Sequence, residues 1–283
     1  SGGFITFSKP CKTLSESSKK CGANLVMLMF SSLVFLLLSR YALCPKHNQP
    51  HRGPKNTPNI FGILKMALHL GQHALLETDN PFASLLTKPG VNEVLELRSK
   101  FGFMAFHGGW LEEVTDDIAQ VAAERSDSSF YAVLQGPDDQ WHIPSHLVAP
   151  ADSPLLTQFI EHVDVVVAVH GFGRPDLLKS VLLGGRNRQL AEFVACRLMT
   201  RLPHYEILYD LEKIPKSLRG QHSQNPVNLP RDGGIQLELP PRIRGKSPLW
   251  TGFKGPGRVP HHEALIEGLA AAARDWITLN SSP

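Results

Sequence analysis

The sequence predicts an α/β domain whose central sheet is mostly parallel or mixed, with helices on both faces. Two observations predict this class. From about residue 101 onward, short apolar runs typical of strands alternate with segments of helical spacing. The run 163–169 is apolar apart from Asp164, as expected of a central strand that is buried on both faces.

The first predicted elements are a strand at 101–106, a helix that starts at Thr115 and a strand at 130–134. Thr115 is a good N-cap, and Asp116 and Asp117 follow in the first turn, where their charges favour the helix dipole. The polar residues 127–129 close the helix before the next strand begins.

The second half continues the alternation. Gly184-Gly185 precedes a segment with an apolar helical stripe, in which Cys196 is expected to be a small core residue. An Ala-rich segment forms the closing helix. In chain order, the expected elements are a helix at 155–162, a strand at 163–169, a helix at about 187–202, strands at 205–209 and 235–239, and a helix at 263–277.

Charge is distributed unevenly along the chain. Residues 1–59 contain eight Lys and Arg but one acidic residue, a net charge of +7. Residues 60–283 contain 21 Lys and Arg and 25 acidic residues, a net charge of −4. The sequence pI of about 8.7 therefore derives from the N-terminal tail, and it does not indicate a nucleic-acid-binding domain.

Composition divides the chain into three expected regions: a tail at 1–60 with a Pro-rich linker, a linker helix at 61–84 and the folded catalytic domain at 85–283. Segment 25–38 is almost wholly apolar but shorter than the roughly 20 residues of a membrane span. Two alternatives stay open for it: a signal or anchor, or an artefact of the gene model. Localisation, cytoplasmic or secreted and membrane-anchored, depends on which holds.

Polar residues with metal-binding chemistry follow two of the apolar runs. His107 and His170 each come directly after a predicted strand, and Glu112 follows a short turn after His107. Sites in open α/β sheets gather at the carboxyl ends of the strands, so these side chains are expected at one edge. Two imidazoles and one carboxylate leave a fourth position for water, as in catalytic zinc sites. We predict one zinc ion per chain.

A further carboxylate lies inside the last predicted strand. Gln236 and Glu238 share one face of this strand, and the apolar residues share the other. Burial would raise the pKa of Glu238 toward that of a useful general base. We expect it to take a proton from water and pass it to a leaving amine, which predicts a metal-dependent amide hydrolase.

Other candidate motifs are weaker. His142 and His146 have helical metal-ligand spacing, but Pro144 lies between them and would break a helix, so they are not expected as ligands. His261-His262 is expected in a solvated loop. No G-x-S-x-G motif is present, which argues against a serine hydrolase.

Six sequence segments together resemble the poly-gamma-glutamate hydrolase family, over roughly residues 87–250. The resemblance implies a fold similar to the zinc carboxypeptidases and zinc-dependent hydrolysis. It also implies zinc ligands His107, Glu112 and His170 and a catalytic Glu238, the same four residues that the spacing selects. In chain order, the segments are HGGWLE, SFYAVLQG, WHIPSH, VVAVHGF, LLGGRNRQLA and GIQLELPPRIR.

An acidic substrate requires basic groups near the site, and arginine binds carboxylates in a bidentate manner. We predict substrate contacts by four arginines that follow predicted strands or site motifs: Arg174, Arg186, Arg188 and Arg242.

The predicted activity is a zinc-dependent amidohydrolase or peptidase that cleaves γ-glutamyl amide bonds. Alternatives are an N-acyl amino acid deacylase, a cell-wall carboxypeptidase of the same fold and, less favoured, a non-catalytic binding protein. The expected partner is an acidic peptide or acyl-amino-acid substrate. Nucleic acid is not expected as a partner, and a membrane is expected only if segment 25–38 is a genuine anchor.

Overall fold

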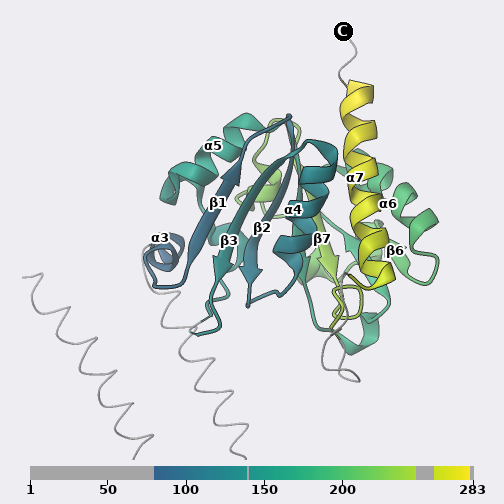
Figure 1. Ribbon diagram of the computed structural model, residues 1–283, viewed down its shortest axis with the longest axis horizontal. Helices are drawn as coiled ribbons and strands as arrows, with labels where there is room; N and C mark the ends of the chain where they lie inside the picture. The colour runs from purple at the N-terminus through teal and green to yellow at the C-terminus, as the bar shows by residue number, and fades with distance from the viewer. Residues whose placement is uncertain (1–79, 139, 247–257, 281–283) are drawn as a thin grey trace, which may run out of the picture. The chain divides into compact units, whose positions relative to one another are not determined.

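The computed structural model describes residues 80–138, 140–246 and 258–280. A seven-stranded mixed sheet lies between helices on both of its faces, which confirms the predicted fold class (Figure 1). The order of strands across the sheet is β1-β3-β2-β4-β7-β5-β6. The tail at 1–60, with its apolar segment, and most of the linker helix at 61–84 lie outside the described residues.

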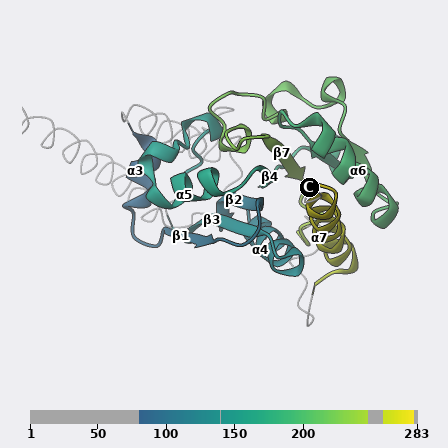
Figure 2. The same cartoon turned by 90° about the horizontal axis from the view of Figure 1, so that it is seen from above.

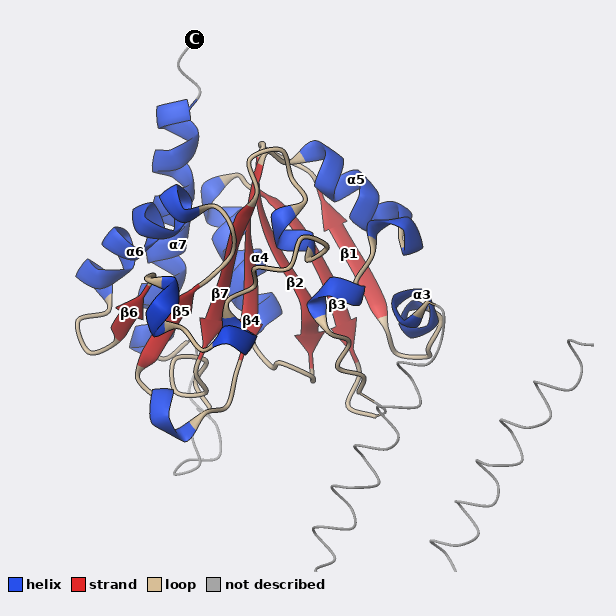
Figure 3. Cartoon of the chain, turned by 180° about the vertical axis from the view of Figure 1, so that it is seen from behind, coloured by secondary structure: helices blue, strands red, loops and turns tan. Residues whose placement is uncertain are grey.

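Four strands in the middle of the sheet are parallel: β2 (Phe101–Gly109), β3 (Ser129–Gln135), β4 (Val165–Gly171) and β7 (Gly234–Leu239). Figure 3 shows the arrowheads of β2, β3 and β7 pointing the same way. Their carboxyl ends therefore meet at one edge of the sheet. All four were predicted from the apolar runs.

The remaining strands lie toward the two sides of the sheet. β1 (Asn92–Glu96) is antiparallel to β3, and β5 (Ser180–Leu183) is antiparallel to β7. β6 (Glu206–Leu208) pairs with β5 in the parallel direction. The sequence pattern does not predict β1 or β5, because each is too short to show a clear period and β1 is only partly buried.

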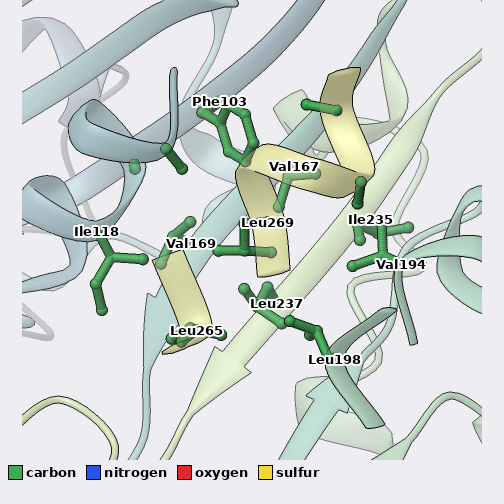
Figure 4. Packing of buried hydrophobic residues seen from close by; sticks show 14 of the residues in the cluster. Phe103, Ile118, Val167, Val169, Val194, Leu198, Ile235, Leu237, Leu265 and Leu269 are labelled. Carbon is green, nitrogen blue, oxygen red and sulfur yellow. The ribbon is translucent and has the colours of Figure 1, made fainter. Parts of the chain in front are cut away.

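Three helices cover one face of the sheet: α4 (Thr115–Ser126), α6 (Arg188–Arg201) and α7 (Pro260–Asn280) (Figure 2). Alternate residues of the central strands pack against them. Figure 4 shows Phe103, Val167 and Leu237 gathered around Leu269 of α7. The larger of the hydrophobic cores lies on this face.

Two helices pack on the opposite face: α3 (Pro81–Leu86) and α5 (Pro154–His162). Met104 and Val166 point toward this side, so β2 and β4 are buried on both faces. Phe82 of α3 is fully buried in this second core. The predicted domain boundary at residue 85 falls within α3.

Single-turn 3₁₀-helices lie in the connections between these elements, and several of them border the site described below. None of the helices in the described part of the chain has the length and apolar content needed to cross a membrane. The 3₁₀-helices are η1 (Ser145–Leu147), η2 (Pro150–Asp152), η3 (Pro175–Leu177), η4 (Leu211–Lys213), η5 (Lys216–Leu218) and η6 (Pro226–Asn228).

Three local predictions were wrong. Thr115 is the first residue of α4 and not its N-cap, because its hydroxyl donates to the carbonyl of Glu112, and the N-cap is Val114. Cys196 is exposed, since it lies on the side of α6 that faces away from the sheet. His261 and His262 lie in the first turn of α7, where His262 is buried.

Candidate functional site

Three side chains with metal-binding chemistry meet at the carboxyl edge of the sheet. His107 lies near the end of β2, His170 near the end of β4, and Glu112 in the turn that follows β2. The His107 Nδ1 atom is 2.9 Å from Glu112 Oε1, and the His170 Nδ1 atom is 3.3 Å from Glu112 Oε2. One possible ligand atom of each residue lies within 4.8 Å of the others. The structure thus brings together the three residues that the sequence proposed as ligands.

A tight turn folds Glu112 back toward the two histidines. The Glu112 amide donates to the carbonyl of His107 at 3.0 Å, and the Thr115 hydroxyl donates to the carbonyl of Glu112 at 2.7 Å. Val114 has a φ of 78°, a left-handed conformation that is strained for a β-branched residue. Such strain persists where the surroundings require it, and here it accompanies the placement of Glu112.

Hydrogen bonds test whether the cluster suits a metal. His107 Nε2 lies 2.9 Å from the carbonyl oxygen of Ile143, which only accepts hydrogen bonds, so Nε2 carries the ring hydrogen. The Nδ1 atom then points at a carboxylate oxygen 2.9 Å away, and either a proton or a metal cation can join the two atoms. A backbone carbonyl that accepts from the other ring nitrogen is the usual partner of a metal-binding imidazole. The donor set therefore fits a divalent cation such as zinc.

Electrostatics within the cluster favour charge pairing. Burial raises the pKa of Glu112, but the charges and hydrogen bonds of His107 and His170 lower it by more, so the pKa lies below the usual range of a glutamate. Burial lowers the pKa of His170, and the neighbouring Glu112 and Glu238 raise it above its usual value. His170 Nε2 is buried without a hydrogen-bond partner among the described residues. The low pKa keeps Glu112 ionised, so its carboxylate can bind a cation.

Glu238 lies on β7 directly opposite His170 of β4 and is almost fully buried. Burial raises its pKa, while His170 and a hydrogen bond from Gln236 act in the opposite direction. The apolar neighbours in β7 point into the larger core, so Gln236 and Glu238 share the other face as the alternation predicted. This environment suits a general base.

A chain of hydrogen bonds with a defined direction leads to Glu238. The Asn225 Oδ1 atom accepts from the Val227 amide, so the Asn225 Nδ2 group is the donor to Gln236 Oε1, at 2.8 Å. Gln236 must then donate through Nε2, and it does so to Glu238 Oε1 at 2.7 Å. All three side chains are buried. The chain occupies Oε1 as an acceptor and leaves Oε2 for proton transfer.

Both carboxylates and both histidines open into one pocket of about 580 Å³. This volume is in the usual range for ligand sites. Its walls come from the segment between β3 and α5 and the segment between β6 and β7. Other lining residues include His142, His146, Lys216, Gln221, His222 and Asn225.

His142 was not expected to be a metal ligand, yet it lies beside the cluster. Its Nε2 atom is 3.9 Å from Glu112 Oε1, and its ring centre is 4.6 Å from that of His107. Partial burial, together with His107, lowers the pKa of His142 to about 4. His142 lies in a loop, so its position beside the cluster does not depend on a helix through Pro144, and it is not one of the three candidate ligands. Lys216, Gln221 and Asn225 gave no local sequence signal.

The four arginines that the sequence proposed for substrate binding do not line this pocket. All hydrogen bonds of the Arg188 guanidinium go to backbone carbonyls, those of Leu183, Gly184, Gly185 and Tyr209. The role of the four arginines toward substrate stays a prediction. Arg174 pairs with Asp176 at 3.6 Å, and Arg186 and Arg242 are exposed.

Arg244 lies close enough to the carboxylates of the site to interact with them electrostatically. Burial lowers its pKa, and the charges of Glu112, Glu113 and Glu238 oppose this effect. Its Nη1 group donates to the carbonyl of Glu113 at 2.9 Å, and its guanidinium packs against Gly171. A Cβ on Gly171 would lie 2.6 Å from the guanidinium carbon, so a larger residue there would displace the Arg244 side chain.

Comparison with known proteins supports the fold. Solved structures that share it include the following two. The structure of a bacteriophage poly-gamma-glutamate hydrolase matches with a TM-score of 0.54 at 18% identity, covering 67% of this chain and 91% of that one. A protein described as YNDL in its apo, zinc-free form matches with a TM-score of 0.54 at 17% identity, covering 69% and 94%. The search of curated proteins gives no match.

The family model described as poly-gamma-glutamate hydrolase matches residues 85–257, which is more than half of the chain. This range contains the candidate metal ligands, Glu238 and every described residue that lines the pocket. The chain therefore belongs to the poly-gamma-glutamate hydrolase family.

Proposed function

We propose that this protein is a zinc-dependent hydrolase that cleaves γ-glutamyl amide bonds in an acidic, poly-γ-glutamate-like substrate. The observation that carries the proposal is the buried cluster of His107, Glu112 and His170, which lies beside a buried Glu238 in one pocket. Membership of the hydrolase family supports the same reaction class.

His107, Glu112 and His170 would hold one zinc ion per chain. Bound zinc supplies a Lewis acid that polarises a carbonyl and lowers the pKa of water. The Ile143 carbonyl orients His107, and the Gly171 amide, which donates to Glu112 Oε2 at 2.9 Å, orients the carboxylate. These contacts hold His107 and Glu112 in place before substrate arrives.

Glu238 would act as the general base. Its Oε1 atom accepts from Gln236, so the free Oε2 atom would take a proton from the attacking water. The same oxygen would then deliver that proton to the nitrogen of the leaving amine, which restores the carboxylate. Removing the proton acceptor would halt this transfer while leaving the three metal ligands intact.

Hydrolysis of γ-linked tetraglutamate by the zinc-loaded protein tests the proposal, with α-linked tetraglutamate and an N-acyl amino acid as competing substrates. We expect cleavage of the γ-linked peptide, and a loss of at least about 100-fold in kcat for Glu238→Gln. Glu212→Gln, at an exposed carboxylate outside the pocket, is the matched control. Preferred cleavage of the N-acyl amino acid would favour the deacylase alternative, and no cleavage of any of the three would contradict the proposal.

A further inference from the structure

The pocket extends from the metal cluster into a region with a different character. Three side chains from two connections line it: His146 of η1, between β3 and α5, and Lys216 of η5 and His222, both between β6 and β7. We call these three residues the basic arm. Each is exposed and available to a ligand from solvent.

Contacts hold the two histidines of the arm together. The rings of His146 and His222 lie 4.7 Å apart between centres, with their planes tilted by 42°. The His222 Nδ1 atom accepts from the Gln224 amide at 3.2 Å, so the neutral ring carries its hydrogen on Nε2. His222 thus has a donor free for a ligand that accepts hydrogen bonds.

The charges of the pocket separate into two regions. Among the described residues that line it, the carboxylates are Glu112 and Glu238, and both belong to the catalytic cluster. The nearby Glu212 carboxylate is 3.5 Å from Arg219. No carboxylate in the described part of the chain forms an ion pair with Lys216. The basic arm therefore has one permanent positive charge and imidazole donors with no acidic side chain to neutralise them.

We propose that the basic arm binds a free carboxylate of the substrate, next to the amide bond presented to the metal cluster. The inference rests on the proposed function and names the recognition element of the same site. Every residue of a γ-linked glutamate chain carries a free α-carboxylate, so a residue adjacent to the cleaved bond brings an anion into the pocket. An ammonium group and imidazole N–H groups are suitable partners for that anion.

Binding can be measured apart from catalysis. The test uses the full chain loaded with zinc and carrying Glu238→Gln, with isothermal titration calorimetry. One probe is γ-linked tetraglutamate, and the other is the same tetramer with its α-carboxylates amidated. We expect Lys216→Gln to weaken binding of the acidic probe about fivefold and to leave binding of the amidated probe unchanged.

Two variants serve as controls. Lys216→Arg keeps the charge and should keep the affinity. Lys213→Gln removes an exposed charge three residues away, outside the pocket, and should have no effect. Equal weakening by Lys213→Gln and Lys216→Gln would overturn the proposal, because it would indicate non-specific attraction. Equal affinity for the two probes, or no binding of the acidic probe, would overturn it as well.

The outcomes separate this inference from the proposed function. Cleavage of tetraglutamate by the wild-type protein without dependence of binding on Lys216 would overturn the basic arm and leave the proposed function standing. Selective binding that depends on Lys216, without cleavage by the wild-type protein, would support the arm and contradict the proposed function.

Discussion

Replacement of Gln236 by methionine tests how Glu238 is positioned. Methionine has a similar length but cannot donate to Glu238 Oε1, so the variant removes the 2.7 Å hydrogen bond to the carboxylate. It also leaves the buried Nδ2 group of Asn225 without its acceptor. Both effects follow from the direction of the hydrogen-bond chain, and they act on different properties of the protein.

The magnitudes can be worked from these contacts. A hydrogen bond to a charged group contributes about 1.5–3 kcal/mol, which corresponds to roughly 10- to 150-fold in rate if it is needed to hold the base. An orphaned buried donor costs about 1–3 kcal/mol of stability, or several degrees in Tm for a domain of this size. Because the Gln236 side chain forms hydrogen bonds with Asn225 and Glu238 and with none of the three candidate ligands, zinc content should stay the same.

The assay measures steady-state kinetics on γ-linked tetraglutamate, together with zinc content and Tm. We expect kcat to fall by about 10- to 100-fold with little change in KM. The exposed neighbour Gln224→Met is the control and should resemble the wild-type protein. A kcat within about twofold of wild type would refute the positioning role. A loss of rate that follows a loss of zinc would refute it too.

Three further predictions concern stability. Gly109→Ala should destabilise the fold by about 2 kcal/mol or more, because φ is +71° and a Cβ would lie 2.3 Å from the Gln135 carbonyl oxygen. Gly90 has a similar φ but open space around it, so Gly90→Ala should lower the free energy of unfolding, measured in urea, by less. Burial lowers the pKa of His262 in the folded protein. Below about pH 6.5 the unfolded chain therefore binds more protons than the folded protein, and stability decreases as the pH is lowered. His262→Phe should reduce this slope in thermal melts at several pH values, and an unchanged slope would contradict the assignment. Chelation should lower Tm, and zinc at 100 times its Kd should restore about 2.7 kcal/mol, whereas His170→Ala should not respond to zinc.

Much of the fold was predictable because the central strands are buried on both faces. The apolar run that became β4 and the alternation in β7 follow directly from where their side chains point. The same logic placed Gln236 and Glu238 on one face. By contrast, β1 and β5 depend on pairing with neighbours distant in sequence, and their few residues carry no clear period.

The candidate metal cluster was predictable because its histidines lie near the ends of neighbouring strands, and Glu112 follows one of them after a short turn. The rest of the pocket was not. His142 and Lys216 lie in irregular segments whose path depends on tertiary packing, and no local pattern predicts it. The contacts of Arg188 were not predictable either: its residue type suggested carboxylate binding, and its guanidinium donates to backbone carbonyls around the start of α6. Sequence patterns specify chemical type and period, whereas loop packing decides which groups share a cavity.

Metal content measured by mass spectrometry tests the central claim most directly. We expect about one zinc per chain in the wild-type protein and in Glu238→Gln, which keeps all three candidate ligands. His170→Ala should lose the metal while staying folded by circular dichroism. A folded wild-type protein that binds no divalent metal, or a His170→Ala variant that keeps it, would contradict the assignment of His107, Glu112 and His170 as a metal site.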